Sequence, residues 1–235
     1  MQSGMSATLL PVRPSARTSK SRLRSLSLAG PAGRLEAVLN EGAPGARYAA
    51  LVCHPHPKGG GSLHNKVVYH AMKAMNDEAW GLGWPVLRFN FRGVGLSEGE
   101  HDGRAETGDV EAALAWLENE YKLPLIVAGF SFGAAMALKA CCGRGNIRAL
   151  AALGLPTHAE GRDYHYSFLR ECTLSKLFLS GDQDPYAPAT QLAQVAAASA
   201  EPKQLVLLPR ADHFFTGELE PMQRALAGWL MEQTR

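Results

Sequence analysis

A serine flanked by glycines is the residue in this chain whose setting best fits nucleophilic chemistry. Ser131 is the centre of the run GFSFG at 129–133, directly after an apolar run and directly before a helical pattern. In the order strand, sharp turn, helix, this pattern holds a serine hydroxyl above a sheet, where a helix N-terminus stabilises negative charge. The bare pattern is a weak signal, so other residues must supply the base and acid that activate the serine.

A histidine and two aspartates follow Ser131 at positions suited to this task. In a doubly wound sheet, the acid comes first along the chain and the histidine second. His213 lies just beyond the last predicted strand, in a loop at the carboxyl edge of the sheet. Asp182 and Asp184 both follow the preceding predicted strand, and either could orient His213. Asp212 adjoins His213 and is badly placed to do so.

Short apolar runs alternate with longer helical patterns along most of the chain. This alternation predicts an α/β fold with a mostly parallel, doubly wound sheet and helices on both faces, as one domain over 21–235. Ligands in such folds bind beyond the carboxyl ends of the strands. Two early runs, 23–28 and 35–39, predict an antiparallel lead-in pair. The expected strands are 49–53, 86–90, 125–129, 149–155, 176–180 and 204–208, and the expected helices are 65–80, 106–121, 132–142, 190–199 and 218–233.

The charge distribution is uneven, although the net charge of the 235 residues is only +2. Six cations precede the first acid, Glu36, and the rest of the chain carries 18 cations against 22 acids. Such an acidic body is a poor binder of nucleic acid. Residues 1–20 are expected to form a basic, disordered leader, although a Ser/Arg-rich, acid-free segment is also typical of an organellar transit peptide. No apolar run is long enough for a membrane span or a secretory signal, so we expect no membrane partner.

The four cysteines predict a cytoplasmic protein with reduced, structural thiols. Cys53, Cys141, Cys142 and Cys172 show no Cys-x-x-Cys spacing, and the adjacent pair is badly placed to bridge to itself. An organellar location is expected only if the leader is a transit peptide.

Five segments together resemble a subgroup of the α/β-hydrolase superfamily, one that is small, bacterial in type and nearly lid-less. They span most of the chain between about residues 50 and 215 and follow the subgroup's order, and jointly they are highly specific. The segments are HPHP at 54–57, NKVV at 65–68, RFNFRGVG at 88–95, GFSFG at 129–133 and ADHFF at 211–215.

The resemblance implies a serine hydrolase that cleaves carboxylic esters through an acyl-enzyme intermediate, without a cofactor or a metal. It implies Asp184 as the triad acid beside Ser131 and His213, and leaves Asp182 a turn-forming role. It also implies an oxyanion hole made by the N–H of Phe132 and an N–H of the 54–58 loop. Prolines 55 and 57 have no N–H, which leaves His56 or Lys58, and the position within the motif favours His56.

Other interpretations stay open on the sequence. A thioesterase or an amidase would share these residues. So would a catalytically inactive protein that keeps the fold and binds a partner. A metal cluster at His54, His56, His64 and His70 lacks a carboxylate or cysteine at helpful spacing. The run GVGLSE at 93–98 imitates a dinucleotide fingerprint but lacks its third glycine, and it reads better as a tight loop that carries Arg92 near the pocket rim.

The segment 156–171 occupies the place where larger relatives insert a lid, and it is only 16 residues long. Three of its aromatic residues could line an acyl pocket or could serve ordinary packing: Tyr164, Tyr166 and Phe168. We therefore expect an open, partly apolar pocket for a small-molecule ester with a short or medium acyl chain. The sequence gives no indication of the oligomeric state.

Overall fold

A single twisted sheet of eight strands runs through the part of the chain that the structure describes. The computed structural model describes residues 22–159, 162 and 164–235, so the leader predicted at 1–20 lies outside it. The strands are β1 (Leu23–Gly30), β2 (Gly33–Asn40), β3 (Ala49–Cys53), β4 (Val86–Phe89), β5 (Leu125–Phe130), β6 (Ile147–Leu153), β7 (Ser175–Gly181) and β8 (Lys203–Leu208). Their spatial order is β1-β2-β4-β3-β5-β6-β7-β8.

The sheet is mostly parallel, as the alternation of elements predicts. The hairpin of β1 and β2 joins the sheet by antiparallel pairing of β2 with β4, and every pairing from β4 to β8 is parallel. All residues of β3, β4 and β5 are buried, because helices cover both faces of a parallel sheet. The carboxyl ends of β3, β5, β7 and β8 therefore meet at one edge of a rigid frame.

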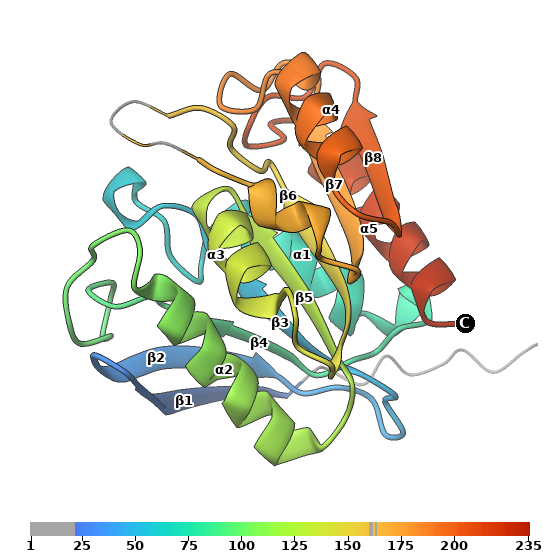
Figure 1. Ribbon diagram of the computed structural model, residues 1–235. Helices are drawn as coiled ribbons and strands as arrows, with labels where there is room; N and C mark the ends of the chain where they lie inside the picture. The colour runs from blue at the N-terminus through green and yellow to red at the C-terminus, as the bar shows by residue number, and fades with distance from the viewer. Residues whose placement is uncertain (1–21, 160–161, 163) are drawn as a thin grey trace, which may run out of the picture.

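Helices form two layers around the sheet, and each layer closes one hydrophobic core. Core residues of α2, α3 and α4 pack on one face, and those of α1 and α5 pack on the other. Figure 1 shows α2 and α3 in front of the sheet and α1 and α5 behind it. Within the described residues, no helix is both long and apolar enough to cross a membrane. The helices are α1 (Lys66–Asn76), α2 (Glu106–Tyr121), α3 (Phe132–Cys141), α4 (Ala189–Ala198) and α5 (Leu219–Gln233).

The helix predicted over 65–80 is shorter than its apolar periodicity indicates. Asn65 caps α1 by accepting hydrogen bonds from the N–H groups of Val67 and Val68. The helix ends at Asn76 because Asp77 is extended, with φ −76° and ψ 120°. The Asp77 carboxylate then caps a separate 3-10 turn, Glu78–Trp80, by accepting from the N–H of Ala79.

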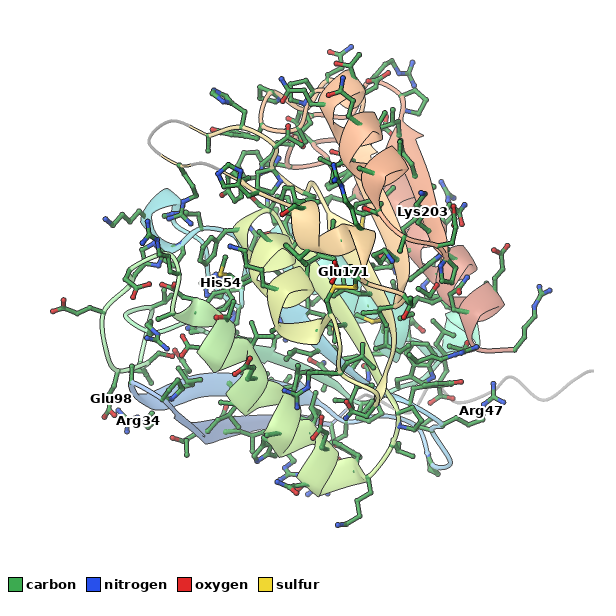
Figure 2. All side chains as sticks on the ribbon, in the orientation of Figure 1. Arg34, Arg47, His54, Glu98, Glu171 and Lys203 are labelled. Carbon is green, nitrogen blue, oxygen red and sulfur yellow. A yellow bond between two sulfur atoms is a disulfide. The ribbon has the colours of Figure 1, made fainter. Side chains whose placement is uncertain are left out.

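The expectation that all four thiols are reduced is wrong for two of them. Cys142, just after α3, forms a disulfide with Cys172, which follows the 3-10 turn Ser167–Arg170. Cys53 and Cys141 are free and buried. Figure 2 shows the disulfide next to Glu171, the residue that precedes Cys172. The adjacent cysteines do not pair with each other, and the partner of Cys142 lies 30 residues away, where the sequence gives no local signal.

Candidate active site

Ser131 lies on a strained turn between β5 and α3. Its φ of 54° and ψ of −121° are values that a residue with a side chain rarely adopts. The turn is held because the Ser131 N–H donates to the carbonyl of Leu153 on β6, at 2.9 Å, and its own carbonyl accepts from Ala134 at 2.9 Å. Ser131 is half-buried, whereas its neighbours Phe130 and Phe132 are fully buried. Only the serine of this turn is therefore open to a ligand.

Two glycines of the GFSFG run allow β3, β5 and α3 to approach closely. A Cβ on Gly129 would collide with the carbonyl of Gly133 and the backbone of Ala134 in α3. A Cβ on Gly133 would collide with the carbonyl oxygens of Cys53 and His54 at the end of β3. The spacing of the two glycines therefore serves the packing of the turn.

The structure brings Ser131, His213 and Asp184 together in one hydrogen-bonded chain. The Nε2 atom of His213 lies 3.0 Å from Ser131 Oγ, and its Nδ1 atom lies 2.8 Å from Asp184 Oδ2. Each residue stands on a loop at the carboxyl end of a different strand: β5, β8 and β7 in that order. His213 and Asp184 are buried at 4% and 3% exposure, so water competes little for their hydrogen bond.

The two aspartates that qualify from the sequence have different surroundings. Asp184 Oδ1 accepts from the N–H groups of Tyr186 and Ala187 at 2.8 and 3.1 Å, which fixes the carboxylate toward His213. Asp182 accepts instead from the N–H of Arg210, at 2.7 Å, across the turn. Of the two aspartates, Asp184 is therefore the one that contacts the imidazole, while Asp182 bonds to the backbone across the turn.

The loop after β3 presents one free backbone N–H beside the serine turn. The Lys58 N–H donates to the ring of its neighbour His56, at 3.1 Å. The N–H groups of His56 and Phe132, in contrast, donate to no acceptor that belongs to the described residues. The rings of His56 and Phe132 are 5.1 Å apart, so the loop after β3 contacts the first residue of α3.

His54 holds this loop against the neighbouring strand. Its Nε2 accepts from the Phe91 N–H at 3.0 Å, so the proton is on Nδ1, which donates to the carbonyl of Pro55 at 2.6 Å. Burial lowers the pKa of His54 to about 4, against the opposing effect of its bond to the Pro55 carbonyl. The ring is therefore neutral near pH 7. Its place at the end of β3 can be seen in Figure 2.

The histidines of the alternative metal interpretation are not brought together. His54 is bound to the end of β4, and His70 lies on α1 with its Nδ1 3.0 Å from Gln223 on α5. Among the residues that the structure describes, no three His, Cys, Asp or Glu side chains are grouped as ligands of one ion.

Arg92 anchors a helix and is not a rim residue. Its guanidinium donates to both carboxylate oxygens of Asp109 in the first turn of α2, and its backbone N–H donates to the same carboxylate. The Arg92 and Asp109 side chains are only 10% and 0% exposed. The buried bonds between Arg92 and Asp109 thus hold the start of the GVGLSE loop against α2.

The aromatic residues of the short lid segment pack on one another and on a helix layer. The rings of Tyr164 and Tyr166 are stacked at 6.1 Å, and Phe168 lies 6.4 Å from Tyr166. The Tyr166 hydroxyl donates to the carbonyl of Pro156 at 2.7 Å. All three lie against the core beneath α3 and α4. A role for them in an acyl pocket stays a prediction.

Comparison with known proteins decides the family. Residues 49–224 match the model of an alpha/beta hydrolase domain. The chain belongs to the α/β-hydrolase family. It is 34% identical to an uncharacterized protein of Rickettsia prowazekii, over 86% of each chain.

Two solved structures resemble this α/β hydrolase over most of its length. A serine hydrolase homologue from Coxiella burnetii is 32% identical, with a TM-score of 0.79, over 88% of this chain and 97% of the other. A serine hydrolase without a lid from Xanthomonas campestris is 30% identical, with a TM-score of 0.78, over 95% and 97%. The small lid segment of this chain agrees with that architecture.

Two features of this α/β hydrolase are missed by reasoning from the sequence. The Ser180 hydroxyl donates to Asp184 Oδ2 at 3.0 Å, and only its place four residues before the aspartate could have indicated this. His101 Nδ1 lies 2.5 Å from Glu106 Oε1, and the His101 ring contacts the rings of His56 and Phe132. The sequence carries no motif for this second histidine–carboxylate pair.

Proposed function

We propose that this α/β hydrolase is a serine hydrolase that cleaves carboxylic esters through an acyl-enzyme intermediate. The observation that supports the proposal is the chain of hydrogen bonds from Ser131 through His213 to Asp184, at 3.0 and 2.8 Å. A serine hydroxyl at this distance from an imidazole can pass its proton to the ring as it attacks a carbonyl carbon.

The reaction follows from these positions in two halves. His213 Nε2 takes the proton of Ser131 as Oγ bonds to the ester carbon, and then gives that proton to the departing alcohol oxygen. A water molecule next attacks the acyl-enzyme with His213 again as base, which releases the acid and restores the serine. The Asp184 carboxylate keeps the ring oriented and stabilises its charged form.

The negative charge that develops on the carbonyl oxygen needs donors that are already in place. The N–H groups of Phe132 and His56 are free for this role, and Phe132 also begins α3, whose dipole favours an anion. Pro55 and Pro57 stiffen the peptide between them. The loss of one such donor typically costs roughly 10²–10³ in rate.

A serine-directed fluorophosphonate probe tests the proposal directly. Labelling of the wild type should vanish in Ser131→Ala, and ester hydrolysis should fall by roughly 10⁶-fold in kcat. Ser27→Ala, which changes an exposed serine on β1, is the matched control and should label normally. A folded wild type that neither labels nor hydrolyses esters would contradict the proposal and favour a binding protein that kept the fold.

The preferred bond and acyl length require a second set of substrates. We expect p-nitrophenyl esters to be cleaved faster than the matching thioester or anilide, as the proposed ester substrate class requires. Within an ester series from acetate to palmitate, we expect short and medium chains to have the highest kcat/KM. A preference for palmitate would refute an open pocket.

A further inference from the structure

A positively charged group lies beside the residue that follows the nucleophile. The guanidinium carbon of Arg162 is 5.0 Å from the centre of the Phe132 ring, over its face. The rings of His56 and His101 surround the same phenyl group at 5.1 and 5.5 Å. His56, His101 and Arg162 come from the loops that follow β3, β4 and β6, respectively. The fold therefore brings this cluster together at the carboxyl edge of the sheet.

The backbone holds the Arg162 guanidinium in place. Its Nη1 donates to the carbonyl of Gly103 at 3.3 Å. Gly103 has φ +84°, and a Cβ there would collide with the guanidinium, so a glycine is needed for this contact. A cation stacked on an aromatic ring and tied to a carbonyl is oriented before a ligand arrives.

The charge of Arg162 has no acidic partner within 4 Å among the described residues. Two carboxylates of the described segment after β4, Glu106 and Asp102, have other partners. Glu106 contacts His101 and accepts from the N–H groups of Asp102 and Gly103 at 3.1 Å. Asp102 accepts from the N–H groups of Arg104 and Ala105. A guanidinium has five N–H donors. The carbonyl of Gly103 engages one nitrogen and the Tyr164 side chain interacts with the same group, which leaves further N–H donors for a ligand.

The surroundings of His56 also indicate a positive potential at this place. Burial, together with the neighbouring Arg162, His101 and Lys58, lowers the pKa of His56 to about 4. His56 is therefore neutral near pH 7, and the cations around it favour an anion. On the lid side, Tyr164 lies close to Arg162; burial raises the pKa of its hydroxyl and the guanidinium offsets part of that rise.

The cluster lies on the acyl side of the proposed reaction. The departing alcohol must be within reach of His213 Nε2, which protonates it. The neighbours of His213 are aromatic: Tyr186 at 4.7 Å and Phe214 at 5.2 Å, which are 44% and 51% exposed. The groups around Phe132 are different ones, from other loops: His56, His101 and Arg162. We therefore place the acyl chain on that side of Ser131, toward the cation that stacks on Phe132.

We propose that the acyl half of the substrate carries a terminal carboxylate, which the Arg162 guanidinium binds while Ser131 is acylated. The substrate class is thus the half-ester of a dicarboxylic acid, and hydrolysis consumes water and yields the dicarboxylate, an alcohol and a proton. The inference rests on the proposed esterase function. Charge-assisted, two-pronged bonds between arginine and carboxylate combine strength with orientation, which suits the selection of one class of acyl group.

The test compares an anionic ester with a neutral ester of the same shape. The substrates are monomethyl glutarate and the methyl ester of glutaric monoamide, and the readout is the ratio of their kcat/KM values. We expect the wild-type ratio to favour the anion by about 10- to 100-fold. The ratio should fall toward one in Arg162→Gln and take an intermediate value in Arg162→Lys. Arg170→Gln removes an exposed cation of the same segment and should keep the wild-type ratio.

The ratio separates this inference from the proposed function and from general damage to the site. If the wild type hydrolyses both esters equally, the carboxylate preference is wrong while the esterase stands. If Arg162→Gln slows both esters in parallel, the guanidinium has a structural role only, and the inference is overturned. If the wild type cleaves neither ester and does not label with the fluorophosphonate, the proposed function itself fails.

Discussion

Two aspartates of one turn, Asp182 and Asp184, differ in what their carboxylates contact and in burial, since Asp184 is buried and Asp182 is exposed. Asp184 contacts His213, whereas Asp182 accepts from a backbone N–H of the neighbouring loop. We expect Asp184→Asn to lower kcat by about 10⁴-fold, because an amide in this position favours the wrong imidazole tautomer. Asp182→Asn should leave kcat close to wild type, because an amide oxygen can still accept from Arg210. Steady-state hydrolysis of p-nitrophenyl butyrate measures both, and equal losses would contradict the assignment.

A second prediction at the scale of residues concerns His54 and acid. Burial lowers the pKa of His54 to about 4, compared with 6.5 in the unfolded chain. Between these values the unfolded chain binds a proton that the folded chain does not. The free energy of unfolding should therefore fall as the pH drops from 6.5 to 4, by about 1 kcal/mol per pH unit and about 3 kcal/mol in all.

Urea unfolding of the wild type and of His54→Gln at pH 7, 5.5 and 4.5 measures the contribution of His54 to the pH dependence of the free energy of unfolding. The variant is less stable at pH 7, because it disturbs the contact with the Phe91 N–H. Its stability should depend less on pH than that of the wild type, and the difference between the two isolates His54 from the titrating carboxylates. Parallel pH dependences would show that His54 does not contribute.

At the scale of elements, the Arg92–Asp109 pair fastens the loop after β4 to α2. Both side chains are almost fully buried, so removal of one partner leaves an uncompensated charge. We expect Asp109→Ala to lower the free energy of unfolding by about 3–5 kcal/mol. Glu220→Ala breaks the exposed pair of Glu220 and Arg224 on α5 and should cost less than about 0.5 kcal/mol. Urea unfolding compares the two, and similar losses would contradict the role of burial.

The elements themselves were largely predictable, because their apolar runs and helical periods are local properties. The predicted strands lie within two residues of those in the structure, and α2 has the predicted bounds. The end of α1 was not predictable from periodicity, since the extended backbone at Asp77 interrupts it.

The site residues that stand in sequence motifs were predictable, whereas contacts between residues of different elements were not. Ser131, Asp184 and His213 stand in recognisable segments. The pairings of Arg92 with Asp109, of His101 with Glu106 and of Arg162 with Phe132 each join a loop to a helix. The disulfide was not predictable either, because the spacing of its two cysteines does not mark them as a pair.

At the scale of the whole molecule, the proposed chemistry belongs to the body of the chain after Glu36. Residues 1–20 carry three cations, no acid and none of the proposed site residues. We expect a chain that lacks them to keep its kcat/KM for p-nitrophenyl butyrate while its net charge changes from +2 to −1. Kinetics and cation-exchange retention measure the two effects, and a large loss of activity would show that the leader contributes to the site.

A cytoplasmic location stays a prediction, and the disulfide weakens the argument from reduced thiols on which it partly rests. Disulfides persist in oxidising compartments and are rare in the cytosol of mesophiles. If the leader is a transit peptide, the expected location is an organelle and not the cytoplasm.

The Cys142–Cys172 bond also decides what happens if a protease cuts the short lid segment. Ser131 precedes the ring that this bond closes, while Asp184 and His213 follow it. A single cut within 156–171 therefore leaves two fragments that are still linked covalently, with the nucleophile on one and its base and acid on the other. Nicked protein should run as one band without reductant and as two bands with it, and should keep its labelling by the fluorophosphonate as long as the bond is intact. The cross-link thus acts as a tether that preserves a divided active site.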